Sequence, residues 1–291
     1  MTSPITKMIT AFRRHLKKQK KHPSTVQSYS NDATLFIDWL TQTIGKGFSV
    51  RSITSADIKD FKSYLLTRDV SATSVNRKLT ALRQFFDFAI TQNEIGQNPV
   101  AVVPSIPLAV HFPSVLTKKE QLLLLRTVDK SMRPLDSSII LLLLQTGLRG
   151  SEICALTVGD LHLTPRKAKI FIRGDQGKKL RFVNLTLRTQ TALRQYCRRK
   201  GISILSRLRR DEPLLRQTNG IALTQQYIDH VVKRIGKQAG IAYVTPTMLR
   251  NTFAIQNLMN GEAPDKVERA LGVGSVKTLQ KMVESMKQQE E

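Results

Sequence analysis

The sequence predicts a mainly α-helical chain of two domains, the second of which contains a small antiparallel sheet. Three observations lead to this prediction. Apolar residues recur at helical spacing through residues 1–98, prolines gather between 99 and 113, and apolar residues alternate between 161 and 187. A chain of 291 residues is long enough for each domain to bury a core of its own.

Helical periodicity is most regular between residues 74 and 91, where apolar side chains return every three or four positions. Thr54 and the segment Ser71–Thr73 are predicted N-caps, and Pro23–Thr25 should break the chain and cap another helix. The first domain is therefore expected to contain four helices, at about residues 6–19, 25–42, 55–67 and 74–91.

The second domain should open at Thr117–Glu120, which has the spacing of a capping box. Further helices are expected at 137–146 and at 152–156, the latter capped by Ser151. Alternating apolar residues then predict two strands joined by a hairpin turn at 173–179. The rest of the chain returns to a helical pattern, so the sheet is small.

The formal net charge of +24 is the strongest feature of the composition. Residues 1–104 contribute +8 and the rest +16, so the excess is not confined to a tail. Such a charge implies a polyanionic partner, either nucleic acid or an anionic membrane surface. The longest apolar run is well short of the ~20 residues that span a bilayer, and the first residues lack a signal-peptide pattern. Nucleic acid is therefore expected and a membrane is not.

Cys154 and Cys197 are the only cysteines, and they have no metal-ligand spacing. Cys154 lies in an apolar helical pattern and is expected in the core. We predict a cytoplasmic, nucleoid-associated protein with no metal and no cofactor. An aromatic content of 6% gives little support to RNA as the partner, because no stacking platform is evident.

Two segments carry arginines in long, specific patterns. The first is QTGLRGSEI at residues 145–153, and the second is TPTMLRNTF at residues 245–253. Both resemble the arginine-bearing boxes of the tyrosine recombinase, or phage integrase, family, and the likeness is Xer-like in character. A lone arginine at 149 could instead form a salt bridge with Glu152 or Asp160, and this alternative stays open.

The resemblance spans about Ala11 to Met282 and implies a fold and a partner. Residues 1–104 would form the helical, SAM-like core-binding domain, 105–115 a linker, and 116–291 the recombinase-type catalytic domain. The two domains of this family close as a clamp around double-stranded DNA. Arg149 and Arg250 would bind a backbone phosphate, since a planar guanidinium can contact two of its oxygens.

Three positions depart from the family pattern. Thr247 replaces a histidine or lysine that assists proton transfer, and Val273 replaces a histidine or tryptophan that contacts the phosphate. Met282 stands at the position of the nucleophilic tyrosine, and a thioether is no nucleophile for phosphoryl transfer. No tyrosine follows Tyr243, so a small shift in alignment restores none.

The hairpin of the family carries a lysine that protonates the leaving 5′ oxygen. Here the usual place falls on Gln176, and Lys178 or Lys179 could reach the same point; these lysines could equally be solvated charges. The resemblance also implies further contacts with bases and phosphates at the starts of helices and along one groove-binding helix. These residues are Thr25, Gln27, Thr73, Asn76, Arg77, Thr224, Gln225, Gln226, Lys233 and Arg234.

Because Thr247, Val273 and Met282 depart from the family pattern, we predict a sequence-specific DNA-binding protein that is not an enzyme. Examples of this class are a phage or mobile-element repressor and an accessory factor for a partner enzyme. The alternative is an active recombinase with an unusual nucleophile, for which Ser275, Thr278, Ser285 or a tyrosine from another protein are candidates. Expected partners are duplex DNA, a second copy bound through the C-terminal helix, and a partner recombinase or regulatory protein.

Overall fold

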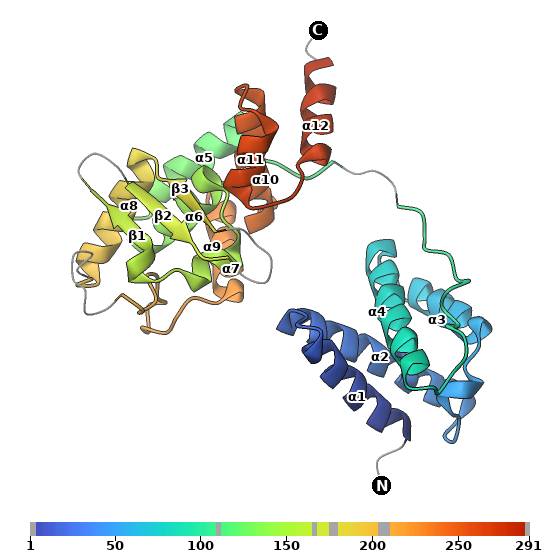
Figure 1. Ribbon diagram of the computed structural model, residues 1–291. Helices are drawn as coiled ribbons and strands as arrows, with labels where there is room; N and C mark the ends of the chain where they lie inside the picture. The colour runs from blue at the N-terminus through green and yellow to red at the C-terminus, as the bar shows by residue number, and fades with distance from the viewer. Residues whose placement is uncertain (1–3, 109–111, 165–167, 175–179, 203–209, 289–291) are drawn as a thin grey trace. The chain divides into compact units, whose positions relative to one another are not determined.

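The computed structural model describes residues 4–108, 112–164, 168–174, 180–202 and 210–288 (Figure 1). The chain divides into two compact units, Met1–Val110 and His111–Glu291. Within the described residues both are built mainly from helices, and the second also holds three strands. The predicted class, mainly helical with a small antiparallel sheet, is confirmed.

In the part that the structure describes, unit 1 is a bundle of four α-helices with one 3₁₀ turn, η1, before the third. Capping side chains begin three of the helices. Thr54 and Asp57 form a reciprocal capping box, and the Ser71 hydroxyl accepts from the Ser74 N–H, as the sequence predicts for both positions. The elements are α1 (Pro4–Lys18), α2 (Pro23–Ile44), η1 (Val50–Ser52), α3 (Ser55–Thr67) and α4 (Ala72–Thr91).

Helix α2 begins earlier than predicted. Pro23 is its first residue instead of a break before it, and the cap is His22, whose ring nitrogen accepts from the Ser24 N–H. Proline suits the first turn because its missing N–H has no helical partner there. The core of the unit is aromatic: Phe36 and Phe61 are fully buried, with ring centroids 5.1 Å apart.

The proline-containing segment after α4 is not an open linker along its whole length. Val100 and Val103 are buried in the core of unit 1. The Asn76 amide donates to the Ile106 carbonyl and accepts from the Ile106 N–H, at 2.8 Å in each case. Lys62 also donates to the Pro104 carbonyl. Pairing of this kind holds the segment to α3 and α4, a long-range effect that composition cannot reveal.

Unit 2 is centred on α6, whose residues 138–144 are all buried. Helix α6 packs on α8 and α10, and it ends where Gly147 takes a left-handed conformation. It starts at Pro134, three residues before the predicted start. The elements in order are α5 (Lys118–Lys130), α6 (Pro134–Thr146), α7 (Gly150–Ala155), η2 (Val158–Asp160), β1 (Leu161–Leu163), β2 (Ala168–Ile172), β3 (Arg181–Asn184), α8 (Leu187–Arg199), α9 (Gln225–Gln238), α10 (Pro246–Met259), α11 (Pro264–Leu271) and α12 (Lys277–Gln288).

The sheet has the order β1-β2-β3 and both pairings are antiparallel. Ile170 pairs with Leu161 on one side and with Val183 on the other, so three buried apolar residues line up across the sheet. The predicted hairpin strands correspond to β2 and β3. The short strand β1 is not among the predicted elements, because three residues are too few for a periodic pattern.

Helices α10, α11 and α12 share a separate apolar cluster. Leu279 and Val283 of α12 are buried in it, and α12 packs against α10 of the same chain. Within the described ranges, no helix combines the length and apolarity required to cross a membrane.

Candidate nucleic-acid interface

A buried carboxylate organises the centre of the candidate site. Both oxygens of Glu152 accept hydrogen bonds from Arg149, one from its backbone N–H at 2.8 Å and one from its guanidinium at 3.0 Å. Arg181 of β3 adds a bidentate pair, with both bonds at 2.9 Å. The predicted cap at Ser151 is wrong: α7 starts at Gly150, and Glu152 reaches back to the N-cap residue Arg149.

The alternative reading of Arg149, a salt bridge to Glu152, is confirmed. The other candidate partner, Asp160, is occupied by Arg173 at 3.0 Å instead. The salt bridge does not use all of the donors of Arg149, whose side chain also lines an open cavity and is 28% exposed. One guanidinium can therefore pair with Glu152 and present N–H groups to an anion.

Arg250 enters the same cluster from α10. It donates to the carbonyls of Gly147 and of Leu271, the latter at 2.8 Å, and lies 3.9 Å from Glu152. Arg149 also donates to the Leu271 carbonyl, at 3.2 Å. The carbonyls at the end of α11 thus hold both guanidiniums, as expected for cations at the negative end of a helix.

Three arginines face one carboxylate, which leaves the cluster with an excess of two positive charges. Burial and the charge of Arg149 lower the pKa of Arg250 to about 10; Glu152 opposes this shift and Arg181 adds to it. Arg250 therefore stays protonated near neutral pH. Burial by itself would raise the pKa of Glu152, but hydrogen bonds and charges from Arg181 and Arg149 outweigh it and lower that pKa. The cluster is thus suited to an anionic ligand.

A cavity of about 670 Å³ opens beside the two arginines. The first turns of α9 and α10 border it, and Thr224 and Thr245 cap these helices with side-chain oxygens. Helix starts present N–H groups and partial positive charge, which adds to the arginine field. The lining residues are Arg149, Gly150, Ser151, Gln225, Ile228, Asp229, Tyr243, Thr245, Pro246, Thr247, Arg250 and Asn251.

The three positions that depart from the family pattern do not lie together. Thr247 lines the cavity, in the first turn of α10. Val273 and Met282 are instead half-buried against the apolar cluster of α10, α11 and α12. The Met282 side chain therefore packs with other apolar groups and does not line this cavity.

The predicted DNA contacts of unit 2 separate into available and occupied side chains. Gln225 lines the cavity, whereas Gln226 and Lys233 are exposed on α9. Arg234 is not available as predicted: it pairs at 2.8 Å with Asp136, whose side chain is only 3% exposed. Leaving that carboxylate unpaired would be costly, which explains why Arg234 points inward.

In unit 1 two of the side chains predicted to contact DNA instead bind other residues of the unit. Arg77 binds both oxygens of the buried Asp32, and the Asn76 amide is taken up by Ile106. Gln27 is exposed and bonds to Arg13 and Asn31 on the surface. Thr25 is half-buried and Thr73 is exposed, so both hydroxyls are near the surface. Lys178 and Lys179 fall outside the described residues.

Sequence reasoning assigned no role to Arg181 or Tyr243. Arg181 forms the shortest ion pair with Glu152, at 2.9 Å, and its side chain is 8% exposed. Its position at the start of β3, directly after the hairpin turn, was the feature of the sequence that could have indicated a role in the site. Tyr243 lines the cavity and is 66% exposed. Its place just before the second arginine box could have drawn attention to it.

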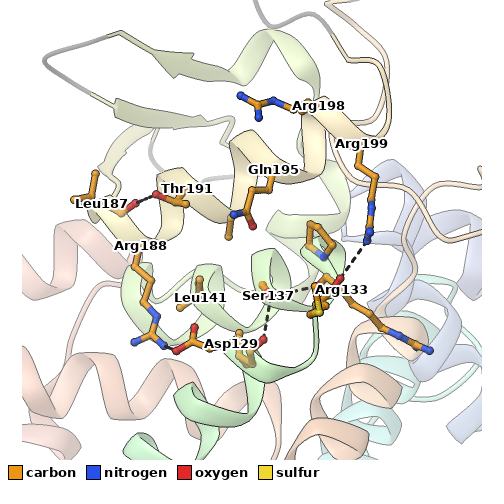
Figure 2. A pocket seen from close by; sticks show the side chains of 14 residues that line it. Asp129, Arg133, Ser137, Leu141, Leu187, Arg188, Thr191, Gln195, Arg198 and Arg199 are labelled. Atoms are coloured by element: carbon orange, nitrogen blue, oxygen red, sulfur yellow. Dashed lines mark hydrogen bonds and ion pairs between the residues drawn. The ribbon is translucent and has the colours of Figure 1, made fainter.

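A larger cavity, of about 970 Å³, lies between the α5–α6 turn and α8 (Figure 2). Figure 2 shows Arg188 paired with Asp129 and Arg199 donating to the backbone of the turn. None of the predicted site residues that the structure describes lines it. We therefore take the smaller cavity, which holds the two arginines, as the candidate site.

The lowered pKa of Glu152 predicts an acid-sensitive contribution to stability. A carboxyl whose pKa is lower in the folded state stabilises the fold above its unfolded pKa, ordinarily 4.5, and loses that contribution as the pH falls through the folded pKa. Urea unfolding of the wild type and of Glu152→Gln between pH 3 and 7 would measure it. We expect the gap between their midpoints to shrink on acidification; a constant gap would contradict the assignment.

Comparison with known proteins places this geometry in a family. Residues 114–289 match the phage integrase family, and residues 9–93 match the phage integrase N-terminal SAM-like domain. The tyrosine recombinase XerC of Thermodesulfovibrio yellowstonii is 31% identical over 278 residues, covering 94% of this chain and 89% of the relative. The tyrosine recombinase XerD of Listeria monocytogenes is 28% identical over 262 residues, covering 88% and 86%.

Solved structures share the fold. The XerH site-specific recombinase bound to a palindromic difH substrate, in a post-cleavage complex, matches with a TM-score of 0.74 and 21% identity, covering 100% of this chain and 98% of that one. A λ integrase dimer bound to a COC′ core site matches with a TM-score of 0.71 and 16% identity, covering 95% and 94%. The predicted combination of a SAM-like domain with a recombinase-type domain is thereby confirmed.

The comparisons contradict the prediction that this chain is not an enzyme. Its curated relatives are named tyrosine recombinases, and they match over almost their whole length. The departures from the family pattern at Thr247, Val273 and Met282 do not outweigh that agreement. Arg149, Arg250 and the two-unit architecture all lie within the matched regions, and the chain belongs to the phage integrase family of tyrosine recombinases.

Proposed function

We propose that this chain is a site-specific recombinase that acts on double-stranded DNA and binds the phosphate under attack in the cavity of Arg149 and Arg250. One observation carries the proposal. The guanidiniums of Arg149 and Arg250, from segments distant in the sequence, are held at one cavity by the Leu271 carbonyl that they share and by the Glu152 carboxylate. Prealigned cations of this kind stabilise the charge that builds on a phosphate during strand transfer.

The charge distribution supports duplex DNA as the substrate. The net charge of +24 is spread over both units, so each can contact the backbone of the polymer. The recombinase XerH and λ integrase, which share the fold, were solved on DNA sites. We assign base and phosphate contacts to the exposed side chains of α9 and of the helix starts in unit 1, namely Thr224, Gln225, Gln226, Lys233, Thr25, Gln27 and Thr73.

Recombination of two sites also requires more than one subunit. The λ integrase relative is a dimer on its core site. We propose that this chain likewise self-associates on DNA, and that the excess charge, which opposes association in solution, is neutralised by the duplex. Met282 has no hydroxyl that could attack the phosphate. The alternative nucleophiles Ser275, Thr278 and Ser285 lie on or beside α12 and do not line the cavity.

The first test concerns the two arginines. Duplexes selected from a random pool by the purified wild-type chain would serve as probes. We expect Arg149→Ala with Arg250→Ala to weaken binding by roughly 10- to 100-fold, because hydrogen bonds to charged groups contribute about 1.5–3 kcal/mol. The slope of the logarithm of affinity against the logarithm of salt concentration should also become less steep, by the amount expected for the loss of about one contacted phosphate. Fluorescence anisotropy from 50 to 300 mM salt would measure both quantities.

A control matched in charge separates site binding from general electrostatics. Arg188→Ala with Arg199→Ala removes two charges from the other cavity and should change affinity much less (Figure 2). Replacing Arg149 and Arg250 by lysine keeps the charge but loses the forked geometry of the guanidinium. The affinity of this variant should therefore lie between those of the wild type and the Ala/Ala variant. Equal affinity of the wild type and the Ala/Ala variant, with both folded by circular dichroism, would refute phosphate binding at this cavity. Binding without any strand transfer would instead indicate a role as repressor or accessory factor.

A further inference from the structure

Strand transfer through a covalent intermediate requires a side chain that can attack phosphorus, and position 282 cannot supply one. The chain has five tyrosines, all of them in described regions. Tyr196 is buried, and its hydroxyl accepts from the Arg216 N–H at 2.8 Å. Tyr29 and Tyr64 belong to unit 1, and Tyr227 packs on the core of unit 2. Tyr243 is the one tyrosine that lines the arginine cavity.

The backbone around Tyr243 directs its side chain outward. Ile241, two residues before it, and Val244, directly after it, are 6% and 2% exposed, so they anchor this loop in the core. Tyr243 itself is 66% exposed and makes no hydrogen bond to any other described residue. A phenol in this position keeps its hydroxyl available while its neighbours hold the loop in place. Buried tyrosines usually find a partner for that hydroxyl, as Tyr196 does.

We propose that Tyr243 is the nucleophile of this recombinase. The inference rests on the proposed function, since it needs a phosphate held by Arg149 and Arg250. In the step, the Tyr243 oxygen forms a bond to phosphorus and the bond from phosphorus to the 5′ oxygen of the next nucleotide breaks. The product is a 3′-phosphotyrosyl ester and a free 5′ hydroxyl.

Protons balance without any co-reactant. The phenolic proton passes to the Asp229 carboxylate, which lines the same cavity, and from Asp229 through solvent water to the leaving 5′ oxygen, so Asp229 ends ionised and no net proton is gained or lost. The two guanidiniums stabilise the charge on the non-bridging oxygens. Ser151 and Thr247 also line the cavity, but an alkyl hydroxyl gives up its proton far less readily than a phenol, whose pKa is about 10.

The test uses the selected duplexes, resynthesised with a 5′-bridging phosphorothiolate at each linkage that the chain protects. Sulfur leaves without needing a proton, so cleavage traps the covalent adduct. We expect the wild type to form an adduct that resists detergent, and peptide mass spectrometry to place it on Tyr243. Tyr243→Phe should bind the duplex within about 2-fold of the wild type yet lose at least 100-fold of the adduct.

Tyr227→Phe is the matched control. It removes a phenol hydroxyl from the first turn of α9, which borders the cavity, and should leave adduct formation unchanged. Three outcomes would overturn the inference: an adduct on another residue, no adduct from wild type bound to the duplex, or a loss of binding in Tyr243→Phe that equals the loss of adduct. An adduct elsewhere would leave the proposed function standing. Failure of the wild type to select any duplex would instead overturn the proposed function.

Discussion

Glu152→Ala is expected to lower the free energy of unfolding by about 3–5 kcal/mol, because it removes the carboxylate that three arginines surround. Arg181 and Arg250 would be left with side chains only 8% and 11% exposed and without a nearby anion. Their mutual repulsion would no longer be offset. Equilibrium unfolding in urea, followed by circular dichroism, measures the change.

A surface acid provides the comparison for Glu152. Glu262 pairs with Lys266 one turn along the chain, with side chains 45% and 64% exposed. Exposed pairs of this kind contribute about 0.2–1 kcal/mol, so Glu262→Ala should hardly move the unfolding midpoint. Equal midpoints for Glu152→Ala and the wild type would show that the arginine cluster does not depend on this carboxylate.

Gly147→Ala is expected to cost about 2–5 kcal/mol through two separate effects. Gly147 has a φ of +65°, where a Cβ is strained by roughly 1–2 kcal/mol. The added Cβ would also fall on the Phe253 ring and lie 2.8 Å from Leu271, which adds about 1–3 kcal/mol of overpacking. Because the Gly147 carbonyl accepts from Arg250, the phosphate site should be disturbed as well.

Gly201 separates the two effects. Its φ is +64°, almost the same as that of Gly147, but nothing lies within 4 Å of an added Cβ. Gly201→Ala should therefore show the backbone strain alone, and the difference between the two variants is the steric cost. Urea midpoints of both variants and the affinity of each for the selected duplexes would be compared. A cost at Gly147 no larger than that at Gly201 would contradict the close packing.

Much of the fold follows from local pattern. The Thr54 cap and the Thr117 capping box form as predicted, because the partners of a cap lie three residues apart and need no distant contact. The helix starts at Pro23 and Pro134 were placed too late, because a proline can open a helix as readily as it can break a chain. The attachment of Ile106 to Asn76 has no local signature at all.

The candidate site shows a similar division. The patterns around Arg149 and Arg250 indicated that these residues act together, and they do line one cavity. Arg234 and Asn76, however, were assigned to DNA although the fold uses them to satisfy Asp136 and Ile106. Which polar side chains remain free depends on what each one meets across the fold.

By itself, the sequence determined the two-unit helical plan, the cationic character of the chain and the two arginine segments, since these depend on composition and on spacing within single elements. Only the tertiary structure decided that Glu152 holds Arg181 as well as Arg149, that Met282 packs with apolar neighbours, and that Tyr243 lines the arginine cavity. The reason is physical: each of these arrangements joins segments distant in the sequence, and burial at such junctions decides which charges must pair and which groups stay available.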